Sequence, residues 1–143
     1  MGWFSLFQRS GPRLRVRPSV ENLHALTKDA PALLITNVGR AAAHDVVVSI
    51  RVRHSAFQFD PVELLDSEAE APLLHSSAGG RFKLEQMTVS AHWFRIALRA
   101  IVQDVKETLR IPLTIRYRDD QGTIRTSYAM LICDEHLRLR VTD

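Results

Sequence analysis

Apolar and polar residues alternate with a period of two along most of this chain. In the clearest run, one face would carry Val46, Val48, Ile50 and Val52, and the other Val47, Ser49, Arg51 and Arg53. Successive side chains of a β-strand point to opposite faces of the sheet, so this run predicts a strand with one buried face. Its β-branched residues favour the same assignment, because they pack well on a pleated surface.

The same alternation recurs in shorter segments on both sides of this strand. These segments are residues 13–17, 33–36, 57–59, 82–84, 93–100, 111–118, 124–132 and 137–141. Pro112 has no backbone N–H, so its strand is expected at a sheet edge or with a break in its hydrogen-bond ladder. Two segments are less regular. Residues 20–31 are consistent with one helical turn or a loop, and residues 62–71 with a short helix or an acidic loop.

Turn sequences separate these strands at two clear places. Asp119-Asp120-Gln121-Gly122 is typical of a hairpin loop. Asn37-Val38-Gly39 also suits a turn, because asparagine and glycine tolerate positive φ and the asparagine amide can bond to its own backbone. About seven to nine short strands joined by such turns predict an antiparallel β-sandwich, with a closed barrel as the structural alternative.

Length and composition limit the organisation of the chain. With 143 residues it has the size of one domain with one core. We therefore expect an aromatic and basic N-terminal tail at residues 1–12 and a single domain at residues 13–143. Cys133 has no cysteine partner, which favours a reducing compartment and a cytoplasmic location. The formal charge of +3 is below the density typical of dedicated nucleic-acid binders, so nucleic acid is a disfavoured partner.

Three aromatic residues gather near the N-terminus. They are Trp3, Phe4 and Phe7, in an apolar stretch too short for a signal peptide or a membrane span. They are candidates for an anchor, either at a membrane interface beside the nearby arginines or on the domain or a protein partner. A partly ordered tail with no binding role is the alternative.

Two motifs resemble parts of the CARDB-type and related bacterial immunoglobulin-like domains. The first is Leu33-Leu34-Ile35-Thr36-Asn37-Val38-Gly39 with the strand at 46–52, which is similar to their Asn-x-Gly turn and following strand. The second, residues 115–122, is similar to their penultimate strand and terminal hairpin. The resemblance spans residues 13–133 and implies an immunoglobulin-like β-sandwich used for adhesion, docking or spacing. It implies no catalytic residues.

Arginines repeat with a period of two on several predicted strands. The candidate binding residues among them are Arg51, Arg53, Arg116, Arg118, Arg138 and Arg140. If their strands are neighbours, the guanidinium groups would form ladders able to bind phosphate, lipid headgroups or an acidic partner. The simpler interpretation is a solvated face on which the arginines pair with carboxylates across strands.

Arrangements that would carry catalysis are not evident in the sequence. The six histidines are scattered, and Gly79-Gly80 lacks the lysine and the serine or threonine of a phosphate-binding loop. We expect no enzyme activity, no metal site and no cofactor. The sequence favours a non-catalytic protein-interaction or assembly module that uses sheet edges and arginine-rich faces. Self-association could bring the acidic segment 63–70 of one copy to the arginines of another. The alternatives are a peripheral protein on anionic membranes and a structural subunit of a larger particle.

Overall fold

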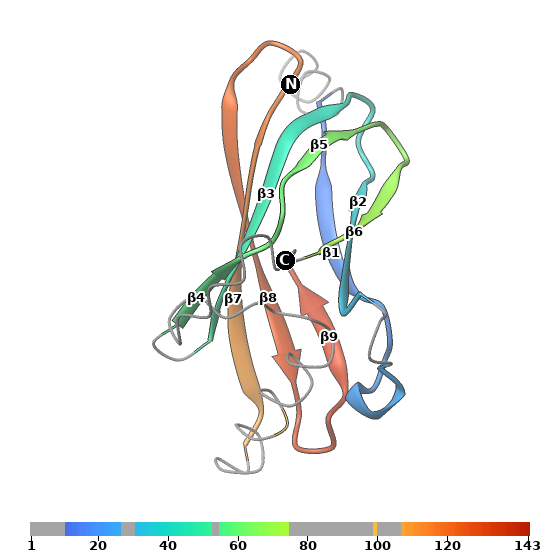
Figure 1. Cartoon of the computed structure of the whole chain (residues 1–143), viewed down its shortest axis with the longest axis vertical. Coiled ribbons are helices and arrows are strands. Elements are labelled where there is room, and N and C mark those ends of the chain that lie inside the picture. Colours follow the sequence, from blue (N-terminus) through green and yellow to red (C-terminus); the bar gives the residue numbers. More distant parts are fainter. Residues whose placement is uncertain (1–10, 27–30, 53–54, 75–98, 100–106) are drawn as a thin grey trace, which may run out of the picture.

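The computed structural model describes residues 11–26, 31–52, 55–74, 99 and 107–143, and shows an all-β chain with two antiparallel sheets (Figure 1). The small sheet has the order β1-β2-β6 and contains β1 (Leu14–Pro18), β2 (Leu33–Asn37) and β6 (Glu70–Pro72). The large sheet has the order β4-β3-β7-β8-β9, and β5 also pairs with β3. Its strands are β3 (Ala43–Val52), β4 (Ser55–Gln58), β5 (Val62–Leu65), β7 (Leu109–Arg118), β8 (Ile124–Cys133) and β9 (Leu139–Thr142).

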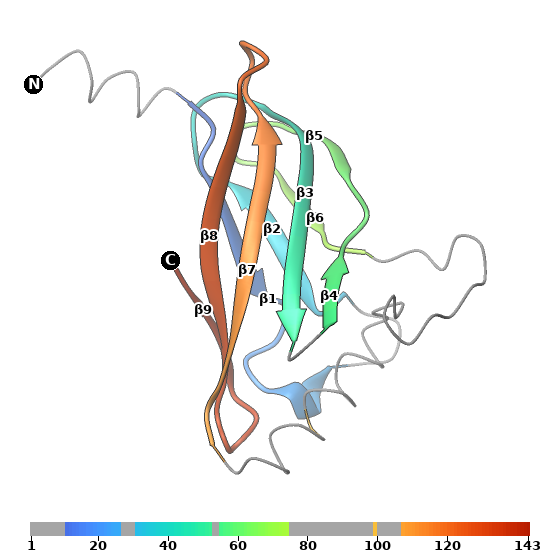
Figure 2. The same cartoon turned by 90° about the vertical axis from the view of Figure 1, so that its left-hand side faces the viewer.

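The two sheets lie face to face and share one hydrophobic core. Figure 2 shows the small sheet behind the large one. Val16 and Ile35 from the small sheet and Val48, Ile115 and Leu131 from the large sheet belong to one cluster of buried side chains. On β1 and β7 the residues with the opposite parity are polar or exposed, so the alternation in the sequence comes from strands with one buried face. No helix in the part of the chain described by the structure is long and apolar enough to cross a membrane.

The strands at 13–17, 33–36, 46–52, 111–118, 124–132 and 137–141 are confirmed, as is the hairpin loop at 119–122. Residues 20–31 include one short 3-10 helix, η1 (Leu23–Ala25). Asn22 caps this helix, because its Oδ1 accepts a hydrogen bond of 2.8 Å from the backbone N–H of His24. The expected strand at 82–84 and the tail residues 1–10 lie outside the described residues.

The expectation for residues 62–71 is wrong, because this segment forms two strands. β5 pairs with β3, and β6 pairs with β2 in the other sheet. The acidic residues lower the strand propensity, but pairing with two distant strands outweighs it. The strand expected at 93–100 is also wrong at Arg99, which has helical backbone geometry. The other residues of that stretch lie outside the described ones.

Pro112 lies in a central strand, since β7 runs between β3 and β8. In the β7–β8 hairpin, the backbone N–H of Asp119 donates to the Thr123 carbonyl. Pairs with and without hydrogen bonds alternate along the two strands from there. By this alternation Pro112 stands in a pair without hydrogen bonds to β8, so its nitrogen faces β3. The pairing of β3 with β7 stops at Ile50 and Leu113, so it does not extend to Pro112, the neighbour of Leu113 on β7. The expected edge position is therefore wrong, and the expected break in the ladder is confirmed.

The β7–β8 hairpin decides which face of β8 is buried. Leu113 lies opposite Ala129, and Ile111 lies opposite Leu131. Directly paired residues project on the same side of a sheet. The odd-numbered residues of β8 that pair with buried residues of β7 therefore face the core as well. The even-numbered residues face away from the core: Ile124, Thr126, Tyr128, Met130 and Ile132.

Candidate interaction surface

The outer face of the large sheet carries most of the arginines that the sequence singled out. We call this surface the arginine face and define it by Arg51 on β3, Arg110 and Arg116 on β7, Arg140 on β9 and Arg138 just before β9. All five are exposed, and each follows or precedes a buried core residue on its strand. Adjacent strands bring these side chains to one surface, so the predicted grouping of Arg51, Arg116, Arg138 and Arg140 is observed.

Strand register fixes the spacing of the arginine face. Arg110 and Arg140 lie opposite Ile132, one from each neighbouring strand. Two strand spacings put their Cα atoms about 10 Å apart. Arg116 lies further along β7, opposite Thr126. The guanidinium groups are therefore spread over a surface several strands wide.

Two of the predicted arginines differ from the rest. Arg118 forms an ion pair with Asp45, which neutralises it, so it is excluded from the arginine face. Asp45 has a φ of 49° and stands where the pairing of β3 with β7 shifts register. Arg53 and the proposed anchor residues Trp3, Phe4 and Phe7 lie outside the described residues.

Ion pairing separates the arginine face from Arg15, Arg17, Arg118 and Arg125. On the small sheet, Arg17 forms two hydrogen bonds to Glu70, of 2.8 and 2.9 Å, and the pairing holds the pKa of Glu70 below its usual range. In the β7–β8 hairpin, Arg125 binds Asp119 at 3.0 Å. The five arginines of the arginine face form no ion pair with any described residue. Among the described residues, the cross-strand pairing of a simple solvated face is therefore found at Arg118 but not at these five arginines.

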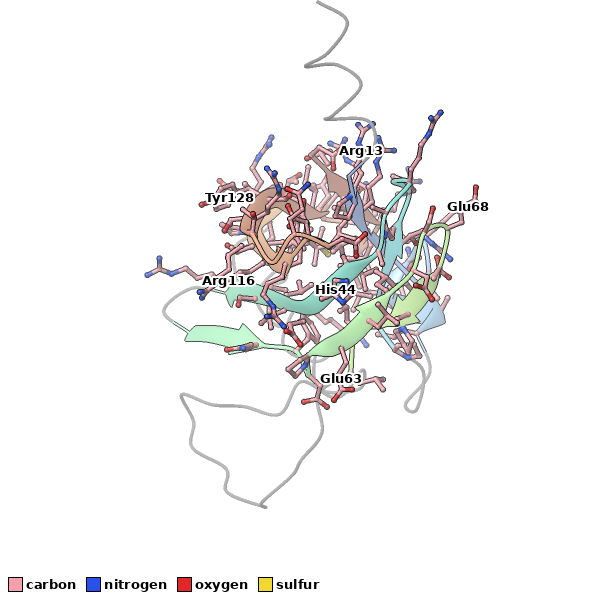
Figure 3. All side chains as sticks on the ribbon, turned by 90° about the horizontal axis from the view of Figure 1, so that it is seen from above. Arg13, His44, Glu63, Glu68, Arg116 and Tyr128 are labelled. Carbon is pink, nitrogen blue, oxygen red and sulfur yellow. The ribbon has the colours of Figure 1, made fainter. Side chains whose placement is uncertain are left out.

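Apolar side chains lie among these arginines. Tyr128 is 73% exposed and Ile124 is 57% exposed, although both are large hydrophobic residues on a central strand (Figure 3). Met130 is half-buried between them and Ile132. Sequence reasoning missed Tyr128 and Arg110 as surface residues. The even spacing between Arg110 and Arg116 indicates that both side chains share one face of their strand, so the sequence could have predicted Arg110. The exposure of Tyr128 follows only from the register of the β7–β8 hairpin.

A pocket lies at one end of the arginine face. Its volume is about 550 Å³, and Arg138, Arg140, Thr108 and Ile132 contribute to its wall. Ile132 is 4% exposed and stands outside the main core, so it forms an apolar part of this wall. Glu21 lies at the pocket as well. The pocket can receive a side chain that is partly apolar and ends in a polar group.

The Asn-x-Gly segment is a structural junction. Asn37 is fully buried, and its side chain makes four hydrogen bonds. Its Oδ1 accepts from the backbone N–H groups of Arg13 at 3.2 Å and Gly39 at 3.0 Å. Its Nδ2 donates to the carbonyls of Ala41 at 2.8 Å and Leu65 at 3.0 Å. One amide therefore ties the start of β1, the β2–β3 connection and the end of β5, which belong to both sheets.

Gly39 serves this junction by its lack of a side chain. Neither Asn37 nor Gly39 has a positive φ, so that part of the expected reason is wrong. The other part, a hydrogen bond between the asparagine amide and its own turn, is confirmed by Gly39 N and Asn37 Oδ1. A Cβ on Gly39 would instead overlap backbone atoms of Gly11, Pro12 and Arg13. The chain before β1 passes directly over this glycine, and Arg40 N donates to the Gly11 carbonyl at 3.3 Å.

Two hairpin loops of the large sheet close on aspartate side chains. Asp119 Oδ1 accepts from the N–H groups of Gln121 at 3.0 Å and Thr123 at 2.9 Å. Asp134 Oδ1 accepts in the same way from the N–H groups two and four residues later, both at 2.9 Å. The hydrogen bond from Arg125, with those from the backbone, holds the pKa of Asp119 below its usual range. Backbone hydrogen bonds, chiefly from Arg138, do the same for Asp134.

These lowered pKa values predict an acid-sensitive stability. Each aspartate has a lower pKa folded than unfolded, so its contribution is complete above the unfolded value near 4 and is lost as the pH falls through the folded value. We expect Asp119→Asn to lower the urea midpoint at pH 7, and the gap from the wild type to close as the pH falls below about 4. Asp66→Asn, in an exposed turn, is the matched control. A difference in urea midpoint between Asp119→Asn and the wild type that stays constant down to pH 2 would contradict this prediction.

Reactive or metal-binding groups do not accompany this surface. Cys133 is buried in the core, where burial raises the pKa of its thiol to about 11 and keeps it protonated near neutral pH. His44 contacts Asp120 at 2.8 Å on the surface. Among the described residues, no three histidine, cysteine or acidic side chains gather into a possible metal site.

Comparison with known proteins gives no relative for this chain. No protein-family model, curated protein or solved structure matches it.

Proposed function

We propose that this chain is a non-catalytic interaction module with an immunoglobulin-like sandwich, and that its arginine face binds an acidic surface of a protein partner. The observation that carries the proposal is that five arginines with no ion pair to a described residue share one sheet face with exposed Tyr128 and Ile124. Exposed apolar patches among polar residues mark interaction sites. Tyrosine and arginine are also enriched among the residues that dominate binding energy.

Strand order supports the immunoglobulin-like part of this proposal. In immunoglobulin domains the first, second and fifth strands share one sheet, while the third, sixth and seventh form the other. Here β1, β2 and β6 correspond to the former group, and β3, β7 and β8 to the latter, if β4 and β5 count as the additional strand beside β3. The Asn37 junction lies at the end of β2, within the first of the two motifs that resemble CARDB-type domains.

The sheet edges are less suited to binding than the face. On one side of the large sheet the edge is interrupted between β4 and β5, where Pro61 has no N–H. On the other side, Leu139 N donates to the Glu21 carbonyl at 2.8 Å, and Leu23 N donates to the Leu137 carbonyl at 2.9 Å. Residues before η1 therefore cover part of the β9 edge. These features hinder the addition of a partner strand at the sheet edges and favour recognition through the arginine face.

Charge also favours an acidic partner. Like charges without counter-charges repel one another, and an acidic surface would relieve that repulsion while steering the encounter. Arginine is suited to this role, because its planar fork binds a carboxylate through two hydrogen bonds. The apolar centre would add contact area that salt does not screen.

The test is binding of a fluorescent ten-residue glutamate peptide, measured by anisotropy. We expect affinity to fall as salt rises from about 20 to about 300 mM, and Arg110→Glu/Arg116→Glu to weaken binding at low salt by about tenfold or more. The control Arg13→Glu/Arg15→Glu makes the same charge change on the small sheet. Equal losses in both variants, or no binding by the wild type, would reject the proposal. Tighter, Arg110-dependent binding of a ten-residue deoxythymidine strand would reject a protein partner in favour of nucleic acid.

A further inference from the structure

Three carboxylates that have no ion-pair partner among the described residues lie along a different part of the surface from the arginine face. Glu63 on β5 and Asp66 and Glu68 in the β5–β6 turn are exposed, and none forms an ion pair with a described residue. By contrast, Glu70 is held by Arg17, and Asp119 by Arg125. We call Glu63, Asp66 and Glu68, together with Leu64, the acidic edge.

The acidic edge has an apolar component like that of the arginine face. Leu64 follows Glu63 on β5 and is 51% exposed. One surface therefore combines arginines with exposed Tyr128 and Ile124, and the other combines carboxylates with an exposed leucine. They match each other in charge and in apolar character, which is the complementarity that specific interfaces use.

The two surfaces cannot satisfy each other within one molecule. Figure 3 shows Arg116 and Tyr128 projecting from one side of the molecule, whereas Glu63 and Glu68 project away from that side, from the two ends of the segment that runs from β5 into the β5–β6 turn. Different patches that fit each other make a head-to-tail contact, and repetition of that contact forms a ring or an open chain.

We propose that the acidic partner of the arginine face is a second copy of this chain, which docks its acidic edge there and continues head to tail. This inference rests on the proposed function, because it uses the same arginine face. Tyr128 forms the centre of the contact, because this exposed ring lies on β8 between the positions opposite Arg116 and Arg110, and tyrosine and arginine are common in binding hot spots. The carboxylates of the neighbour pair with the surrounding arginines. Both surfaces stay available at the ends, so the assembly grows.

Two complementary variants test the head-to-tail contact. Arg110→Glu/Arg116→Glu reverses two charges in the arginine face and keeps the acidic edge, and Glu63→Lys/Glu68→Lys reverses two charges in the acidic edge and keeps the arginine face. In sedimentation velocity at about 20 mM salt, the wild type should show mass that rises with concentration and falls at about 300 mM. Each variant alone should stay monomeric. An equimolar mixture should stop at the dimer, because each variant has one working surface.

A chain with all four substitutions gives a further control. Its arginine face then holds three arginines and two glutamates, and its acidic edge holds two lysines and Asp66, so both surfaces are net positive and this chain should stay monomeric. A monomeric wild type, a monomeric mixture, or association equally lost in Arg13→Glu/Arg15→Glu would overturn the inference. Circular dichroism and urea denaturation establish that each variant folds. If the wild type is monomeric but still binds the glutamate peptide through Arg110 and Arg116, the inference fails and the proposed function stands; if both assays fail, neither stands.

Discussion

Replacing Gly39 by alanine is expected to lower the free energy of unfolding by about 3 kcal/mol or more, or to prevent folding. The new Cβ would overlap backbone atoms of Gly11 and Arg13, which cannot rotate away as a side chain can. Moving this segment would also stretch the 2.8 Å hydrogen bond from Val38 N to the Arg13 carbonyl. Urea denaturation followed by circular dichroism measures the effect.

Gly122→Ala is the control for this substitution. Gly122 has a φ of 78° and open space around it, so alanine there adds backbone strain of about 1–2 kcal/mol without a collision. A smaller loss for Gly39→Ala than for Gly122→Ala would show that the segment before β1 does not press on Gly39.

Replacing Asn37 by alanine is expected to cost roughly 3–4 kcal/mol, because it removes four hydrogen bonds from a fully buried position. Two N–H groups and two carbonyls would lose their partner, and unsatisfied buried groups retain their desolvation penalty. Equilibrium urea denaturation checks the magnitude. Loss at this junction should also loosen the attachment of β1, since Arg13 is one of the partners.

Asn37→Asp keeps the shape of the side chain but replaces its hydrogen-bond donor by an acceptor. The carboxylate keeps the acceptor for Arg13 and Gly39 but sets an oxygen against the Ala41 and Leu65 carbonyls, so this variant should also be strongly destabilised. Val38→Ala changes the exposed neighbour and should cost under about 1 kcal/mol. Stability of Asn37→Ala close to that of Val38→Ala would mean that water replaces the amide.

Local alternation was sufficient to find the strands whose two faces differ in polarity. The run at 46–51 could be predicted, since buried valines and isoleucine alternate with polar residues along β3. β5 and β6 could not, because acidic residues weaken the strand pattern and their pairing partners lie far away in the sequence. The expected position of Pro112 was only partly right, since the sequence shows the missing donor but not the end of the partner strand's ladder.

The candidate surface was predictable in part for the same reason. Period-two arginines indicate that the guanidinium groups of a strand share a face, and the structure places Arg51, Arg116 and Arg140 on one sheet. The pairing of Arg118 with Asp45 depends on a register shift in β3, which local spacing does not reveal. Alternation along β8 also leaves open which set is buried, so the exposure of Tyr128 follows only from the hairpin register.

The two aspartate-closed loops have a consequence for how the chain reaches this structure. β7, β8 and β9 are consecutive, and each loop between them satisfies its own backbone groups. Closing such short loops loses little chain entropy, whereas the Asn37 junction joins residues as far apart as Arg13 and Leu65. We expect the meander of three strands to assemble early and the junction to close late. A folding chain would therefore bring together the arginines of β7 and of the β9 segment before β1 is fixed in place.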